Sequence, residues 1–285
     1  MEKIIVTTDS ACDLTDAILK ENNIPIVNLI INLDDETFYD RSTIFTDDIY
    51  SYVEKTGRLP KTAALSGLAY EDFFRPYIED GYTVIHISLG SKLSANCQNA
   101  RMAAKELGNI YVVDSCSLST GSALVTLEIS DMVKENNLTA AEIVNIAETD
   151  IVPNVDASFV VDTMEYLKKG GRCSSLAAFS ATLIKLHPSL VMRDGSINVG
   201  KKYRGNMDKV IIEYAKDRLA DSANIRSKRI FVTHTDCDEE TVESVKKIVN
   251  DTLKVETVLE TTAGSTIACH CGKGTLGMLF IRKYS

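Results

Sequence analysis

The sequence has little positive charge for its length. Its 31 Lys and Arg residues are outnumbered by 40 Asp and Glu residues, which gives a formal net charge of −9 over 285 residues. Nucleic acids and anionic membrane surfaces are bound through basic patches. We therefore expect neither nucleic acid nor an anionic membrane as a main partner of this protein.

Long apolar segments are also missing. No run approaches the roughly 18 apolar residues that a membrane-spanning helix requires. Residues 1–6 lead into a strand-like segment, without a cationic region followed by an apolar stretch of signal-peptide length. We therefore predict no stable membrane insertion and a cytoplasmic location. In that compartment the seven cysteines, an odd number, are expected to be reduced thiols.

Several catalytic and cofactor motifs are absent as well. No G-x-G-x-x-G follows the first predicted strand, and Gly272-Lys273-Gly274-Thr275 lacks the remaining residues of a phosphate-binding P-loop. No serine lies in a G-x-S-x-G turn. Cys269-His270-Cys271 contains soft metal ligands, but no C-x-x-C pair completes a zinc site. We therefore predict no nucleotide cofactor, no hydrolase triad and no metal.

Residues 1–154 alternate between strand and helix patterns, which favours an α/β fold with a mainly parallel sheet covered on both faces. Residues 34–45 and 58–66 are expected to be irregular. The expected strands cover 3–8, 25–33, 83–89 and 110–113, and the expected helices cover 14–21, 46–56, 70–79, 120–135 and a segment after Leu93. A capping box at Thr139-Ala140-Ala141-Glu142 predicts one more helix.

The pattern changes after Asn154, so we divide the chain into an N-terminal domain (1–154) and a C-terminal domain (155–285). Asp194-Gly195 predicts the turn of a hairpin over residues 190–199. In the C-terminal domain, helices are expected at 164–169, 207–219 and 239–252, and strands at 158–162, 229–235, 255–259, around Ile267 and at 278–281. Residues 176–186 are strongly apolar.

Polar turns that directly follow strands or precede helices are the candidate binding residues. Ser94, at the expected N-cap of the helix after strand 83–89, is the central one. Ligands in open α/β sheets bind beyond the carboxyl ends of the strands. The turns include Asp9-Ser10, Thr62, Ser91, Ser94, Asp114-Ser115, Arg172, Arg204 and His270. Their hydroxyl, imidazole and guanidinium groups donate hydrogen bonds, which suits a carboxylate or a phosphate.

Taken together and in order, six motifs resemble the DegV family over essentially the whole chain. They are Thr8–Leu14, Ser91-Lys92-Leu93-Ser94, Asp114-Ser115, Tyr166–Arg172, Asp194-Gly195 followed by Lys202-Tyr203-Arg204, and His270–Gly274. The resemblance implies two α/β domains, with a mainly parallel N-terminal sheet, a mixed C-terminal sheet and a long-chain fatty acid between them. It also implies a non-catalytic carrier that presents the fatty acid carboxylate to a separate fatty acid kinase and needs no cofactor.

The resemblance assigns roles to individual residues. Thr62 and Ser94 would hydrogen-bond the carboxylate together with His270, and Arg172 and Arg204 would lie near the pocket mouth or on the kinase-docking face. The candidates for lining the acyl tail are Phe159, Val161, Leu176, Phe179, Leu183, Ile184, Leu190, Met192, Ile267 and Leu276, although for any single one of them ordinary core packing is the more common role.

The chain departs from the family pattern in three places. The family's Thr-Ser-Gln-Pro is Thr62-Ala63-Ala64-Leu65 here, its Ser-Gly-Thr is Ser94-Ala95-Asn96, and its Gly-Pro-Gly is Gly272-Lys273-Gly274. The first change removes a hydroxyl and an amide donor. Two other functions stay open from the residues alone. One is an enzyme for a small carboxylated or phosphorylated metabolite, with His270 as acid or base and an arginine as anion clamp. The other is a regulatory module for which the lipid is only a signal.

Overall fold

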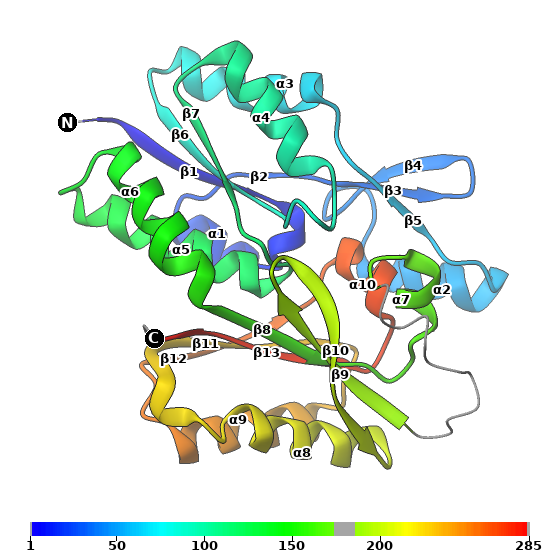
Figure 1. Cartoon of the computed structure of the whole chain (residues 1–285). Helices are drawn as coiled ribbons and strands as arrows, with labels where there is room; N and C mark the ends of the chain where they lie inside the picture. The colour runs from blue at the N-terminus through cyan, green and yellow to red at the C-terminus, as the bar shows by residue number, and fades with distance from the viewer. Residues whose placement is uncertain (1, 174–185, 284–285) are drawn as a thin grey trace.

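The computed structural model of the chain describes residues 2–173 and 186–283. In this part of the chain the strands form three β-sheets, which are layered with helices as Figure 1 shows. The largest sheet belongs to the C-terminal half and a parallel sheet belongs to the N-terminal half. A small antiparallel sheet lies beside the parallel sheet (Figure 1).

The parallel sheet has the strand order β2 (Ile26–Val27), β1 (Ile4–Asp9), β6 (Thr83–Ser88), β7 (Ile110–Asp114). Successive residues of its central strands face opposite layers: Ile5 packs with α3 (Gly67–Glu79) and α4 (Asn96–Leu107), whereas Val6 packs with α5 (Thr120–Glu135) and α6 (Ala140–Ile146). The predicted parallel sheet with two covered faces is therefore confirmed.

The C-terminal sheet is mixed, as expected. Its order is β10 (Ser196–Arg204), β9 (Leu186–Arg193), β8 (Val155–Val160), β13 (Thr275–Arg282), β11 (Ile225–Thr235), β12 (Thr257–Thr262), and of its described pairs only β11 and β12 run parallel. The helices α8 (Met207–Arg218) and α9 (Glu239–Thr252) cover one face. Phe231 and Leu279 on the other face pack against α5, so this helix lies between the two large sheets (Figure 1).

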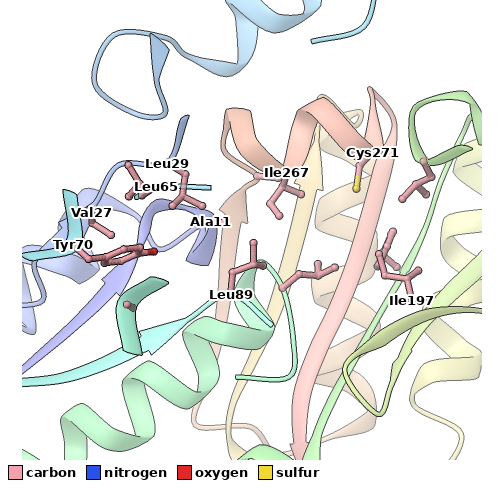
Figure 2. Close-up of a cluster of buried hydrophobic side chains, with 14 of the residues drawn as sticks. Ala11, Val27, Leu29, Leu65, Tyr70, Leu89, Ile197, Ile267 and Cys271 are labelled. Atoms are coloured by element: carbon pink, nitrogen blue, oxygen red, sulfur yellow. The ribbon is translucent and has the colours of Figure 1, made fainter. Parts of the chain in front are cut away.

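The two halves share a continuous apolar core. One buried cluster extends from Tyr70 and Leu65 near the parallel sheet to Ile197 and Cys271 in the C-terminal half, as Figure 2 shows. The domain boundary expected after Asn154 falls at the end of a 3₁₀ turn (Val152–Asn154), directly before β8. It stays a prediction.

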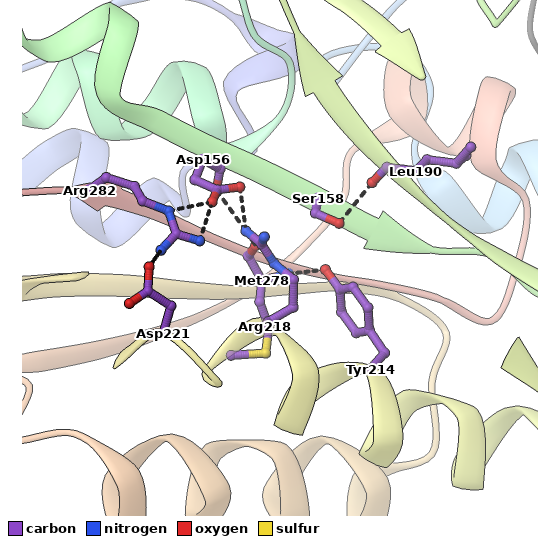
Figure 3. Close-up of polar contacts among 8 residues, drawn as sticks. All are labelled: Asp156, Ser158, Leu190, Tyr214, Arg218, Asp221, Met278 and Arg282. Atoms are coloured by element: carbon purple, nitrogen blue, oxygen red, sulfur yellow. Dashed lines mark hydrogen bonds and ion pairs between the residues drawn. The ribbon is translucent and has the colours of Figure 1, made fainter. Parts of the chain in front are cut away.

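A partly buried ion-pair network joins the two central strands of the C-terminal sheet to α8 (Figure 3). Asp156 on β8 accepts hydrogen bonds from Arg218 of α8 at 2.7 Å and from Arg282 of β13 at 2.8 Å. Although burial raises the pKa of Asp156, the two guanidinium groups hold it below its ordinary value. Arg282 also donates to Asp221 at 3.1 Å, so one network connects two strands with the end of α8.

Three expectations for residues 25–66 are wrong. The single strand predicted over 25–33 is two strands in different sheets, since β3 (Ile30–Leu33) pairs with β4 (Glu36–Tyr39) and β5 (Lys61–Ala63) in the small antiparallel sheet. Both β4 and β5 lie in segments expected to be irregular. The strand is interrupted at Leu29, because its N–H donates to the hydroxyl oxygen of the buried Ser10 and not to a carbonyl of a neighbouring strand. A contact with a residue this distant leaves no local pattern in the sequence.

The strand predicted around Ile267 is also wrong. Residues Ser265–Cys271 form a helix, α10, which leaves the C-terminal sheet and packs against α2 (Thr46–Thr56), β3 and β5 of the first half. Beside it lies α7 (Glu165–Gly170), as Figure 1 shows. A seven-residue helix has little stability of its own, so tertiary packing decides its conformation against the strand preference of its Thr, Ile and Cys residues.

Candidate functional site

A cleft lies between the N-terminal half and the C-terminal half. It contains about 630 Å³ of space, part of it open to solvent. Leu29, Leu89 and Leu118 follow the carboxyl ends of β2, β6 and β7, the edge at which α/β sheets bind ligands. The remaining lining residues are Thr62, Ala63, Ala64, Leu93, Ser94, Asn96, Phe159, Leu167, Arg172, Ile197, Thr266, Ile267, His270 and Cys271.

Most of the cleft wall is apolar. Ile267 and Cys271, one turn apart on α10, point toward Leu89 and Ile197 on the opposite wall, as Figure 2 shows. Phe159 of β8 belongs to the same wall and is almost completely buried. This lining, mostly apolar with a few polar groups at one end, is typical of a pocket that binds an apolar ligand.

The polar end of the cleft is formed by Thr62 and His270. Oγ1 of Thr62, on β5, lies 2.9 Å from Nε2 of His270, on α10. Burial, together with the charge of Arg172, lowers the pKa of His270 to about 4, so the imidazole is uncharged at neutral pH. Its Nδ1 faces Gly170 and finds no partner among the described residues; a Cβ on Gly170 would lie 2.5 Å from it. The imidazole therefore has little freedom to move.

Ser94 also lines the cleft, but it is not the N-cap that the sequence predicts. The helix α4 begins at Asn96, and its N-cap is Ala95. The Ser94 hydroxyl oxygen accepts the N–H of Asn96 at 3.3 Å. Because an oxygen that accepts this bond keeps its own proton, the hydroxyl can still donate to an anion in the cleft.

Asn96 is a cleft residue that sequence reasoning missed. Its side chain is buried, and its Oδ1 accepts the N–H of Leu65 at 2.9 Å, while Asn99 donates to the carbonyl of Leu65 at 2.6 Å. These two bonds fix the loop after Thr62, where the chain departs from the family pattern. The sequence did contain a signal for this residue, since Asn96 is one of the positions at which the chain departs from the family pattern.

The other predicted site residues are distributed as follows. Arg172 lines the cleft with an exposed side chain that donates to the carbonyl of Gly170 at 2.6 Å. Ser91 and Arg204 are exposed and are not among the described lining residues. Of the tail candidates, Phe159 and Ile267 line the cleft, whereas the described residues Val161, Leu190, Met192 and Leu276 do not. Leu176, Phe179, Leu183 and Ile184 lie outside the described residues.

A second depression lies on the outer side of the Thr62–His270 pair. It shares Thr62, His270 and Arg172 with the cleft, and Lys61 and Lys169 add two further cationic groups. The polar pair therefore separates an apolar interior from a positively charged outer surface.

Within residues 2–173 and 186–283, no three His, Cys, Asp or Glu side chains come close enough together to hold a metal ion. Cys269 packs beside Ile31 and Ile44, and Cys271 lines the cleft, so the two thiols of the Cys-His-Cys sequence face different surroundings. None of the helices in the described ranges has the length and apolar content to cross a bilayer.

Comparison with known proteins gives a consistent result. The sequence model described as "Uncharacterised protein, DegV family" matches residues 3–283. A DegV domain-containing protein of Clostridium acetobutylicum is 31% identical, covering 99% of this chain and 100% of its own length. A similar protein of Caldanaerobacter subterraneus is 28% identical, with coverages of 99% and 100%.

Solved structures agree over the same length. A fatty acid-binding DegV family protein from Thermus thermophilus superposes with a TM-score of 0.90 at 27% identity, covering 99% of this chain and 100% of its own. A stearic acid-binding protein from Eubacterium ventriosum gives a TM-score of 0.86 at 26% identity, with coverages of 100% and 99%. Since the family model and these relatives span nearly the entire sequence, the chain belongs to the DegV family.

Proposed function

We propose that this protein binds one long-chain fatty acid in the cleft, with the carboxylate at Thr62, His270 and Ser94 and the tail along Phe159 and Ile267. The observation that carries the proposal is the Thr62–His270 pair at the end of an otherwise apolar cleft. The fatty acids bound by the Thermus and Eubacterium relatives support it.

The uncharged imidazole suits a carboxylate. An Nε2–H tautomer donates to Oγ1 of Thr62, whose own proton is then free to point at the ligand. Ser94 supplies a second hydroxyl proton. Hydrogen bonds to a charged acceptor are stronger than neutral ones, so this pair of hydroxyl groups orients the head group.

The apolar wall supplies most of the affinity. Burying about fifteen methylene groups at about 0.8 kcal/mol each contributes on the order of 12 kcal/mol before the costs of association. A small polar metabolite gains none of this energy and would leave the apolar wall exposed, so an enzyme for such a metabolite is the weaker candidate.

We further propose that the protein is a non-catalytic carrier that presents the carboxylate to a separate fatty acid kinase in the cytoplasm. The outer depression supports this role, because Lys61, Lys169 and Arg172 surround the side of the Thr62–His270 pair that faces away from the tail. Positive charge there favours the approach of a phosphate donor. Arg204, exposed at the end of β10, is a candidate for the kinase-docking face.

Two experiments test the function. Denaturing extraction of the purified protein followed by mass spectrometry should release a long-chain fatty acid in near-stoichiometric amount, and repeated preparations without lipid contradict fatty acid binding. Incubation of the loaded protein with a fatty acid kinase and ATP should then produce acyl phosphate. A loaded protein that yields none supports a regulatory module instead of a carrier.

A further inference from the structure

Two buried carboxylates of the first half hold the start of the helix that carries His270. Oδ1 of Asp13 accepts the N–H of Gly264 at 2.8 Å, and Oδ1 of Asp40 accepts the N–H of Ser265 at 3.1 Å. The first N–H groups of a helix have no partner within it, and negative charge at this end is favourable. The N-terminal end of α10 is thus capped by residues more than two hundred positions away in the sequence.

Each carboxylate is fixed on its other side as well. Oδ2 of Asp40 accepts the hydroxyl protons of Thr266 at 2.7 Å and of Ser10 at 2.8 Å, and Asp13 accepts the hydroxyl proton of Ser119. Asp40 has no exposed surface, and Asp13 is 3% exposed. Burial, with the charge of Asp40 adding to it, raises the pKa of Asp13 to about 7. Two neighbouring buried acids are a costly way to stabilise a fold, which indicates a role in geometry.

The anchored turn leads directly to the imidazole. Thr266 and His270 are four residues apart on α10, so they lie about one turn apart on the same side of the helix. No loop separates the anchor from the histidine. At the C-terminal end of α10, Nε2 of His270 lies 2.9 Å from Oγ1 of Thr62. On the other side of the ring, Gly170 is so close that a methyl group on it would clash with Nδ1. A movement of the first turn therefore changes the distance between Nε2 and Thr62.

We propose that Asp40, supported by Asp13, is a positioning residue for the fatty acid head group. By fixing α10 to the first half, the two acids set the position of His270 relative to Thr62 and so create the preference for a carboxylate. This inference rests on the proposed function, because it assumes that the ligand carboxylate binds at the Thr62–His270 pair.

The test compares two ligands that differ only in the head group. Dissociation constants are measured by calorimetry for a saturated long-chain fatty acid and for the primary alcohol of the same chain length, with delipidated full-length protein. The ratio of the two constants reports the head-group interaction, since effects on the tail or on overall stability change both constants alike.

The decisive variants are Asp40→Ala, which removes the acceptor for Ser265 and Thr266, and Asp40→Asn, which keeps an oxygen for the N–H of Ser265. We expect Asp40→Ala to lower the preference for the acid about tenfold, the effect of weakening one hydrogen bond to a charged acceptor. Asp40→Asn should retain most of the wild-type preference for the acid. If Asp40→Ala does not fold, Thr266→Val replaces it, because this near-isosteric change removes the hydroxyl bound to Asp40 and keeps the shape of the side chain, which also lines the cleft.

The matched control is Asp156→Asn, a partly buried acid whose arginine partners lie on α8 and β13, away from the described cleft lining. It should lower stability without changing the acid-to-alcohol ratio. An unchanged ratio in folded Asp40→Ala, or in Thr266→Val, overturns the inference. A wild-type protein that binds acid and alcohol equally contradicts the proposed head-group site instead, so the two failures are distinguishable.

Discussion

Replacing Thr62 by Val should weaken fatty acid binding without disturbing the fold. Thr62 lies on β5 opposite Ile31, and a valine has nearly the same shape and an equal preference for a strand. The change removes the only hydroxyl within hydrogen-bonding distance of His270 among the described residues. Losing one donor to a charged acceptor costs about 1.5 to 3 kcal/mol. The dissociation constant of the acid should therefore rise about ten- to a hundredfold.

The measurement is a calorimetric titration of delipidated protein, with urea unfolding of the same samples to check the fold. The control is Thr37→Val on β4, whose hydroxyl donates to Asn32 at 2.9 Å on an exposed surface. This variant should bind the acid like the wild type. If Thr62→Val binds the fatty acid with wild-type affinity, Thr62 does not contact the carboxylate and the assignment of the polar end is wrong.

Three further predictions follow from burial and contacts. Burial raises the pKa of Asp9 to about 7 in the folded protein, so its contribution to stability is complete below about pH 4 and is lost as the pH rises toward 7. In urea unfolding between pH 5 and pH 8, the wild type should therefore lose about 2 to 3 kcal/mol of free energy of unfolding that Asp9→Asn does not lose. Gly170→Ala should displace His270 and weaken fatty acid binding about tenfold or more, measured beside Gly67→Ala, whose added methyl group meets no atom closer than 3.8 Å. Phe231→Ala, in the contact between the C-terminal sheet and α5, should lower the free energy of unfolding by about 3 to 5 kcal/mol in urea titrations, and a smaller loss would indicate that the neighbouring residues close the cavity.

Elements with strong local signals were predicted well. The bounds of α2, α5 and α9 agree with the expected helices, and Thr139 caps α6 through the predicted capping box. The hairpin of β9 and β10 turns at Asp194 and Gly195, both with positive φ. In each case the determining interactions lie within a few residues, so the sequence pattern contains them.

Elements that depend on distant partners were missed. The helix α10 needs caps from Asp13 and Asp40, and the small sheet needs β5 to reach β3 across the intervening helix α2. In the cleft, the residues that the resemblance assigned to the head group, Thr62, Ser94 and His270, line one cavity, and their binding role stays a prediction. Asn96 was missed because its role is to hold a loop that is distant in the sequence. Periodicity and propensity describe neighbours along the chain and carry no information about such contacts.

The origin of α10 explains why the polar end of the cleft depends on both halves. A helix of seven residues gains too few hydrogen bonds to offset the cost of its first turn, so it is not stable alone. Its N-terminal caps come from Asp13 and Asp40, and the partner of its histidine comes from β5. His270 therefore reaches the position observed here only when the first half packs against the second. A ligand that contacts both Thr62 and His270 stabilises this packing, by about 2.7 kcal/mol at a concentration a hundredfold above its dissociation constant. Binding of the head group and packing of the two halves against each other are thus thermodynamically coupled.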